Sequence, residues 1–250
     1  MKLKMIMSVL MMACCSALWA GDMTITSKTS GAASALSTTY ITSTATRTNS
    51  PGLGFDVMTD LQKGITYTIN HKAKTIKFTK LADIPAFVTF MAAHTPQSKG
   101  MDEMNARMND LYGDPSIFKV ESSGTETVMG RSCKKTKITS GSLVWEYSMD
   151  TSLRSPIDSA TMLKMTQAGY AGLSSHPKMA RIMKNLTEAA AKLNGVALKT
   201  RMSGYNGETD NEVTAVSQSP IPASTFALPA GYTMTDQIAE SEKMMMAHQH

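Results

Sequence analysis

The chain has 250 residues, of which 42% are hydrophobic and 18% charged, and its formal net charge is +5. This length permits one large domain or two small ones and is ample for a stable core. The positive charge is mild and scattered, and no basic stripe interleaves with aromatic residues, which argues against a nucleic-acid-binding protein.

The chain opens with the features of an export signal. Lys2 and Lys4 precede an apolar run, Met5 to Leu18, that is too short for a comfortable membrane span, and small residues follow near Ala20. We therefore expect residues 1–20 to be a signal peptide and the mature protein to be periplasmic. No second apolar stretch long enough to span a membrane follows.

The three cysteines bear on anchoring and on redox state. Cys14 or Cys15 as the lipidated residue of a lipoprotein signal is an alternative to simple export, although Met11 or Met12 stands where that motif has leucine. If both are removed with the signal, Cys133 is the only thiol left and no internal disulfide can form. We expect Cys133 to be a small buried residue on a strand.

Residues 22–80 alternate apolar side chains with threonine and serine, which predicts successive antiparallel strands. The clearest pattern is the hairpin of residues 64–81, whose side chains on one face are Ile65, Tyr67, Ile69, Ile76 and Phe78. Met23 and Ile25, and likewise Leu36 and Tyr40, are expected to face inward. The opposite faces of these strands carry hydroxyl groups.

Two segments are typical of amphipathic helices inserted between strands. Within residues 83–112, one stripe consists of Met101, Met104, Met108 and Leu111. Within residues 155–195, a second stripe consists of Met179, Ile182, Met183, Leu186, Ala190 and Leu193. Both follow the three- and four-residue spacing of a helix face.

Further strands are predicted on either side of the second helical segment. Residues 117–150 contain short strand patterns separated by glycines, and the last of them places Leu143, Trp145, Tyr147 and Met149 on one face. That face is the most hydrophobic in the chain. Two more strands follow between residues 196 and 217, and residues 236–250 are predicted to be a flexible Met- and His-rich tail.

Motifs that would indicate an enzyme are missing from the sequence. There is no nucleophile elbow, no H-E-x-x-H, no phosphate loop and no C-x-x-C, and the S-x-x-K match at residues 132–135 is interpreted as chance on a strand. We therefore expect no catalytic residue, no cofactor and no defined metal site. The terminal MMMAHQH, with His248 and His250, keeps copper(I) binding open as an alternative.

Three stretches carry a resemblance to a known family. They are VMGRSCKKTKI (Val128–Ile138), the following strand with Trp145, and FALPAGYTM (Phe226–Met234), which is similar to a terminal F-x-x-P-x-G-Y pattern. The chain resembles an exported bacterial family of unknown function that is related in pattern to LolA, the periplasmic lipoprotein carrier. The resemblance extends over residues 22–235 through the order of the elements. It departs from LolA in the helical insert near residues 155–195, and the arginine that helps to keep LolA closed has no matched position.

The resemblance implies an α+β fold in one domain, residues 21–235. The expected architecture is a curved, incompletely closed antiparallel β-barrel with helices covering its concave face. A partly covered apolar face of this kind leaves a cavity for hydrophobic ligands.

The leading hypothesis is a periplasmic, non-enzymatic protein that binds or carries a lipid or the acyl chains of a lipoprotein. The candidate lining residues are Ile65, Tyr67, Ile69, Phe78, Met104, Met108, Leu143, Trp145, Tyr147, Met179 and Met183. One alternative is an envelope protein whose cavity is plugged by its own helices and which contacts membrane-associated partner proteins. Copper handling through the tail is the other.

Overall fold

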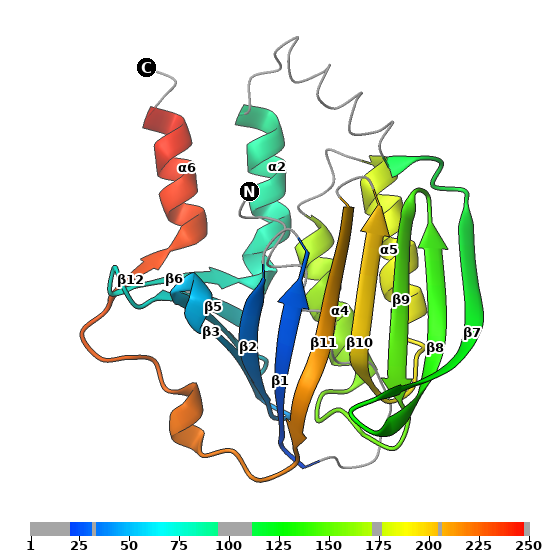
Figure 1. The fold of residues 1–250 in the computed structure, drawn as a ribbon. Helices are drawn as coiled ribbons and strands as arrows, with labels where there is room; N and C mark the ends of the chain where they lie inside the picture. Colours follow the sequence, from blue (N-terminus) through cyan, green and yellow to red (C-terminus); the bar gives the residue numbers. More distant parts are fainter. Residues whose placement is uncertain (1–20, 32–33, 95–111, 172–176, 205–206, 248–250) are drawn as a thin grey trace.

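One twelve-stranded sheet organises the part of the chain that the structure describes (Figure 1). The structure is a computed structural model, and it describes residues 21–247 except 32–33, 95–111, 172–176 and 205–206. The strands are β1 (Met23–Ser30), β2 (Ala35–Ile41), β3 (Ala45–Ser50), β4 (Phe55–Asp60), β5 (Ile65–Asn70), β6 (Thr75–Lys80), β7 (Phe118–Val128), β8 (Arg131–Ser140), β9 (Leu143–Asp150), β10 (Val196–Gly204), β11 (Gly207–Ser217) and β12 (Thr233–Asp236). The helices are α2 (Ile84–His94), α4 (Ser159–Ala171), α5 (Pro177–Ala190) and α6 (Gln237–Ala247), with short 3-10 turns at Pro51–Leu53, Leu81–Asp83 and Ala223–Phe226.

The sheet is open and almost entirely antiparallel. Its strand order is β12-β6-β5-β4-β3-β2-β1-β11-β10-β9-β8-β7, so β12 and β7 are the two edges. Every neighbouring pair is antiparallel except β12, which runs parallel to β6. In Figure 1 the strands from β2 to β6 turn away behind β1, which gives the sheet its curvature. The expectation of an open, curved, antiparallel sheet is confirmed, and the parallel β12 is an addition that the sequence pattern did not predict.

The register gives this sheet two faces with different side chains. Residues directly opposite one another on paired strands point to the same side. We call inner the face that carries Trp145, Tyr147 and Ile25 and lies against α4 and α5, and outer the opposite face. One outer row is Arg47, Met58, Tyr67 and Phe78, and the adjacent inner row is Thr46, Thr59, Thr66 and Thr79.

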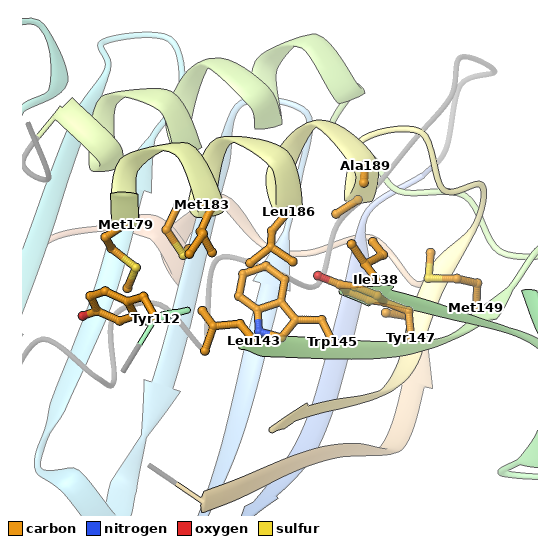
Figure 2. Packing of buried hydrophobic residues seen from close by; sticks show 13 residues of the cluster. Tyr112, Ile138, Leu143, Trp145, Tyr147, Met149, Met179, Met183, Leu186 and Ala189 are labelled. Atoms are coloured by element: carbon orange, nitrogen blue, oxygen red, sulfur yellow. The ribbon is translucent and has the colours of Figure 1, made fainter. Parts of the chain in front are cut away.

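Helices α4 and α5 bury the most apolar part of the inner face. The stripe of α5 packs onto β8, β9 and β10, and its Ile182, Met183 and Leu186 are fully buried (Figure 2). Met162 and Met165 of α4 join a second core cluster with buried residues of β1, β2, β10 and β11, among others. The helical insert therefore supplies much of the core rather than lying outside it.

The corner where the helical insert leaves and rejoins the sheet needs particular residues. Gly195 has φ 102° and leaves no room for a Cβ atom against the carbonyl oxygen of Asp150. The buried Asp150 carboxylate accepts hydrogen bonds from Ser152 N at 2.8 Å, Ser152 Oγ at 2.6 Å and Arg131 Nη1 at 2.9 Å. This corner fixes where α4 and α5 meet the sheet, because Asp150 and Val196 are also paired across β9 and β10.

One expected strand face is wrong. In β2 the side chains of Thr39 and Ile41 are buried on the inner face, whereas Leu36 is 56% exposed on the outer face. Thr39 Oγ1 lies 3.0 Å from Thr48 Oγ1, so a hydroxyl pair occupies the position expected for an apolar residue. The hydrophobicity of Leu36 and Tyr40 suggested that these two side chains, and not Thr39 and Ile41, lie on the inner face.

Helix α6 lies within the segment that the sequence predicts to be a flexible tail. Asp236 caps this helix, because its Oδ1 accepts from Ile238 N at 3.0 Å and Ala239 N at 3.2 Å. Lys77 of β6 forms an ion pair with Glu240, and α6 also packs against α2. Along the described ranges, no helix is both long and apolar enough to cross a membrane. The predicted signal peptide and the Met101–Leu111 stripe lie outside the described residues.

Replacing Leu186 by alanine tests the packing of α5. The change removes a fully buried side chain from the α5–sheet interface. We expect the free energy of unfolding, measured in urea, to fall by about 2–5 kcal/mol. Lys184→Ala on the exposed side of the same helix is the matched control, expected within about 0.5 kcal/mol. Equal losses for the two variants would contradict the burial of α5.

The stabilising contribution of the Asp150 carboxylate should depend on pH. Burial alone would raise the pKa of Asp150, but the hydrogen bonds from Ser152 and Arg131 outweigh it and hold that pKa below its ordinary value. The folded state therefore binds this proton less readily than the unfolded state, so the stabilisation is present above the unfolded pKa and is lost as pH falls below about 4. In urea melts between about pH 6 and pH 3, the stability advantage of the wild type over Asp150→Asn should shrink on acidification. A constant difference would contradict the assignment.

Candidate functional site

Five of the predicted lining residues come together in a closed core. Leu143, Trp145 and Tyr147 of β9 meet Met179 and Met183 of α5, as Figure 2 shows. Trp145 and Tyr147 pack edge to face with ring centroids 6.4 Å apart, and each is 1% exposed. This part of the inner face is filled by the protein's own side chains.

Four other predicted lining residues lie on the opposite face of the sheet. Ile65, Tyr67, Ile69 and Phe78 join Met58 and Ile76 in a cluster on the outer face. Phe226, Leu228 and Tyr232 of the C-terminal segment cover this cluster. The expectation of one common lining is therefore corrected, because the register places these residues and Trp145 on different sides. Met104 and Met108 lie outside the described residues.

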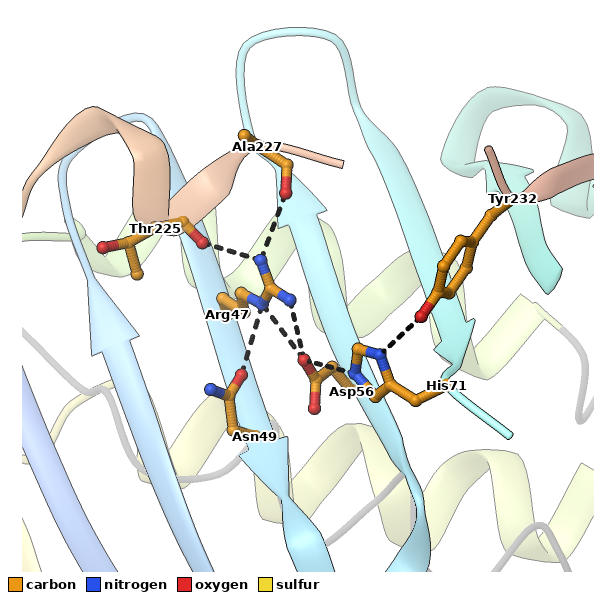
Figure 3. Close-up of polar contacts among 7 residues, drawn as sticks. All are labelled: Arg47, Asn49, Asp56, His71, Thr225, Ala227 and Tyr232. Atoms are coloured by element: carbon orange, nitrogen blue, oxygen red, sulfur yellow. Dashed lines mark hydrogen bonds and ion pairs between the residues drawn. The ribbon is translucent and has the colours of Figure 1, made fainter. Parts of the chain in front are cut away.

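A polar latch fastens the C-terminal segment to the outer face (Figure 3). Arg47 Nη1 of β3 donates to Thr225 O at 2.8 Å and to Ala227 O at 3.2 Å. Its Nη2 donates to Asp56 Oδ2 of β4 at 2.8 Å, and both side chains are largely buried. Arg47 thus joins the backbone of residues 225–227 to two adjacent strands.

The latch continues through a histidine to the end of the segment. His71 Nε2 lies 3.0 Å from Asp56 Oδ2, and His71 Nδ1 lies 3.2 Å from the Tyr232 hydroxyl. Tyr232 is the last residue of the F-x-x-P-x-G-Y pattern, so the pattern marks a segment that covers the outer face. No local pattern in the sequence marks Arg47, Asp56 and His71, because they lie in separate strands and turns.

The inner face of β3 to β6 differs from the closed core. It carries a set that we call the threonine face: Thr46, Thr48, Thr59, Thr66, Thr68 and Thr79. Thr48 Oγ1 pairs with Thr39 Oγ1 at 3.0 Å and Thr59 Oγ1 pairs with Thr66 Oγ1 at 3.2 Å. Each hydroxyl pair joins two neighbouring strands, so some hydroxyl groups of this face already have hydrogen-bond partners within the sheet.

Helix α2 follows β6 and the 3-10 turn Leu81–Asp83 in the chain. It packs between α4 and α6, which lie against β1–β2 and β6 on the inner side of the sheet (Figure 1). Its sequence IPAFVTFMAAH is almost wholly apolar, yet Phe87, Val88, Phe90 and Met91 are only half-buried. None of its described side chains is fully buried, so α2 and the threonine face are the candidate site.

Comparison with known proteins places the chain in a family. The family model described as Domain of unknown function (DUF4412) matches residues 20–232. The chain belongs to the DUF4412 family. A search of curated proteins found no match.

Solved structures with a similar arrangement share little sequence with this DUF4412 chain. An uncharacterized conserved protein from Thermus thermophilus is 8% identical with a TM-score of 0.48, covering 87% of this chain and 91% of its own. A chain of the Pseudomonas aeruginosa MucA/MucB complex is 13% identical with a TM-score of 0.44, and the match covers 86% of this chain and 58% of that chain. A LolA superfamily protein from Nitrosomonas europaea is 6% identical with a TM-score of 0.31, and the match covers 84% of this chain and 90% of that protein's chain. The family match confirms the predicted resemblance to a family of unknown function, and a LolA superfamily protein is among the similar solved structures.

The remaining sequence predictions concern metal binding and the thiol of Cys133. No group of three or more His, Cys, Asp or Glu side chains within them is placed to hold a metal ion. Cys133 is buried as predicted, and burial raises the pKa of its thiol. Met244 and Met246 are exposed on α6, while His248 and His250 lie outside the described residues, so copper binding by the tail stays a prediction.

Arg47→Ala tests the latch. The change leaves the buried Asp56 carboxylate without its guanidinium and two backbone carbonyls without a donor, and we expect a loss of about 2–4 kcal/mol in urea unfolding. Limited proteolysis should also cut residues 218–232 earlier than in the wild type. Lys63→Ala, which breaks an exposed ion pair with Asp60, is the control and should cost less than about 1 kcal/mol. Unchanged cleavage of the segment in Arg47→Ala would contradict the latch.

Proposed function

We propose that this protein is exported to the periplasm and binds an apolar ligand, a lipid or the acyl chain of a lipoprotein, without catalysing a reaction. The ligand site lies between α2 and the threonine face. The observation that carries the proposal is an almost wholly apolar helix whose side chains are only half-buried.

Exposing such a helix to water is unfavourable. A large apolar side chain that is only half-buried forgoes part of the roughly 1.5–3 kcal/mol that full burial contributes. The stripe of α5, by contrast, is fully buried against the sheet. A ligand with an alkyl chain would supply to α2 the apolar contacts that the sheet supplies to α5.

The threonine face suits the opposite wall of such a site. Pairing of hydroxyls along the sheet, as in Thr39–Thr48 and Thr59–Thr66, lowers the demand for outside hydrogen-bond partners. The threonine methyl groups then offer apolar contact. Thr66 and Thr68 remain half-buried, so this wall is not sealed in the way the core around Trp145 is.

A protein-binding role in the envelope is the second candidate, and one observation favours it. Buried side chains of α5 pack over the inner face of β8 to β10, so this half offers less room to a lipid than the region around α2. A protein whose whole inner face is filled would act through its surface, with membrane-associated proteins as partners.

Binding of a fluorescent fatty acid distinguishes the two roles. We expect the purified protein to bind the probe, and Phe87→Glu on α2 to weaken binding at least about tenfold, because a carboxylate would enter the apolar site. Leu36→Glu introduces the same charge on the outer face and should leave the affinity unchanged. Solvent extraction and lipid mass spectrometry of protein isolated from its own host should detect a stoichiometric lipid.

Two results would overturn the ligand proposal. One is an absence of probe binding together with no lipid above a mock-purified control. The other is equal weakening by Phe87→Glu and Leu36→Glu, which would show that the probe does not bind at α2. The first result would favour the protein-binding role.

A further inference from the structure

Strand β7 leaves one edge of the sheet open and apolar. It is the last strand in the sheet order, and its only strand neighbour at hydrogen-bonding distance among the described residues is β8. Ile117, which precedes the strand, and Phe118 and Val120 at its start are 47%, 44% and 49% exposed. Long exposed edges with apolar side chains are templates for pairing with another strand.

The backbone direction of this edge follows from one hydrogen bond. Gly141 N donates to Ile117 O at 2.9 Å, so the carbonyl group of Ile117 points toward β8. Backbone groups of successive strand residues point to alternate sides in the plane of the sheet. The N–H and C=O groups of Phe118, Val120 and Ser122 therefore point away from β8, toward the free edge.

The side chains of the same residues extend the core to the edge. Val120 lies opposite Ile138, which is fully buried beneath α5, and Phe118 lies opposite Ser140. The apolar layer of the inner face thus continues past β8 onto β7, where nothing among the described residues buries it. Lys119 and Glu121 occupy the outer side of the strand.

We propose that β7 pairs antiparallel with β7 of a second copy of this chain, about a two-fold axis at Val120. This register places Lys119 of each copy opposite Glu121 of the other, so two opposite-charge pairs form on the outer side. It also brings both Val120 side chains together on the inner side, beside both Phe118 side chains. An axis at Lys119 or at Glu121 would set like charges against each other, which destabilises a strand pair.

The length of the usable edge makes this association weak and reversible. The register of β7 and β8 shifts between Ser122 and Thr125, and Gly124 has φ 94°. A bulge of this kind bends a strand and interrupts regular pairing. Residues 118–122 remain as a straight edge, and so short an interface fits a weak, reversible dimer rather than an obligate one.

Charge variants test the register by sedimentation velocity over a concentration series. The wild type should dimerise, and Lys119→Glu should weaken dimerisation about tenfold or more, since two attractive pairs become repulsive. Residue 119 faces Thr139 within the fold, so the change leaves β8 pairing intact. Glu121→Lys alone should weaken dimerisation to the same extent. An equimolar mixture of the two variants should form a heterodimer, because residues 119 and 121 of opposite charge then face each other again.

Cysteine variants test the position of the axis. Val120→Cys should cross-link into a dimer on mild oxidation, because opposite residues in such a pair lie about 5.5 Å apart at Cα. Ser122→Cys is the matched control and should not cross-link, because the two copies of residue 122 would be separated by about four residues along the strands, roughly 13 Å.

Three outcomes would overturn the proposal. They are a wild type that stays monomeric throughout the concentration series, a dimer that Lys119→Glu leaves unchanged, and cross-linking of Ser122→Cys in place of Val120→Cys. Each can arise whether or not the protein binds a lipid, so this test is independent of the ligand site.

Discussion

Continuous strand pairing from β12 to β7 is the constraint on which the rest of the structure depends. Successive side chains of a strand point to opposite faces, and opposite residues on paired strands point to the same face. The pairing of all twelve strands therefore decides which side chains lie on the inner face and which on the outer face. Tyr67 and Trp145 are both apolar residues at similar positions in their strands, yet this division puts them on opposite sides. Each face then requires its own cover.

The two covers come from different parts of the chain. On the inner face, the helices inserted between β9 and β10 bury the residues around Trp145, and the Asp150–Gly195 corner fixes where they join the sheet. On the outer face, residues 226–232 bury the residues around Tyr67, held by Arg47. Helix α2 has no equivalent cover among the described residues, which is why the proposed ligand site lies there and not beneath α5.

The sequence predicted features that depend on neighbours along the chain. The hairpin of β5 and β6 has Tyr67 opposite Phe78 and Ile69 opposite Ile76, as its alternation indicated. The stripe of α5 also packs as its spacing predicted. The sequence could not show which strand faces become one surface, since that depends on pairing between distant segments. Leu36 was placed on the wrong face because its hydrophobicity suggested burial, whereas it lies on the outer face with 56% of its surface exposed. Arg47 was missed because its partners are carbonyl oxygens about 180 residues away.

Mapping of a photoreactive fatty acid on the protein by peptide mass spectrometry would test the central claim most directly. If an acyl chain lies between α2 and the threonine face, the label should attach to residues 84–94 and should be displaced by an excess of the unlabelled fatty acid. Labelling of residues 223–232 on the outer face, or no displaceable labelling at all, would contradict the account.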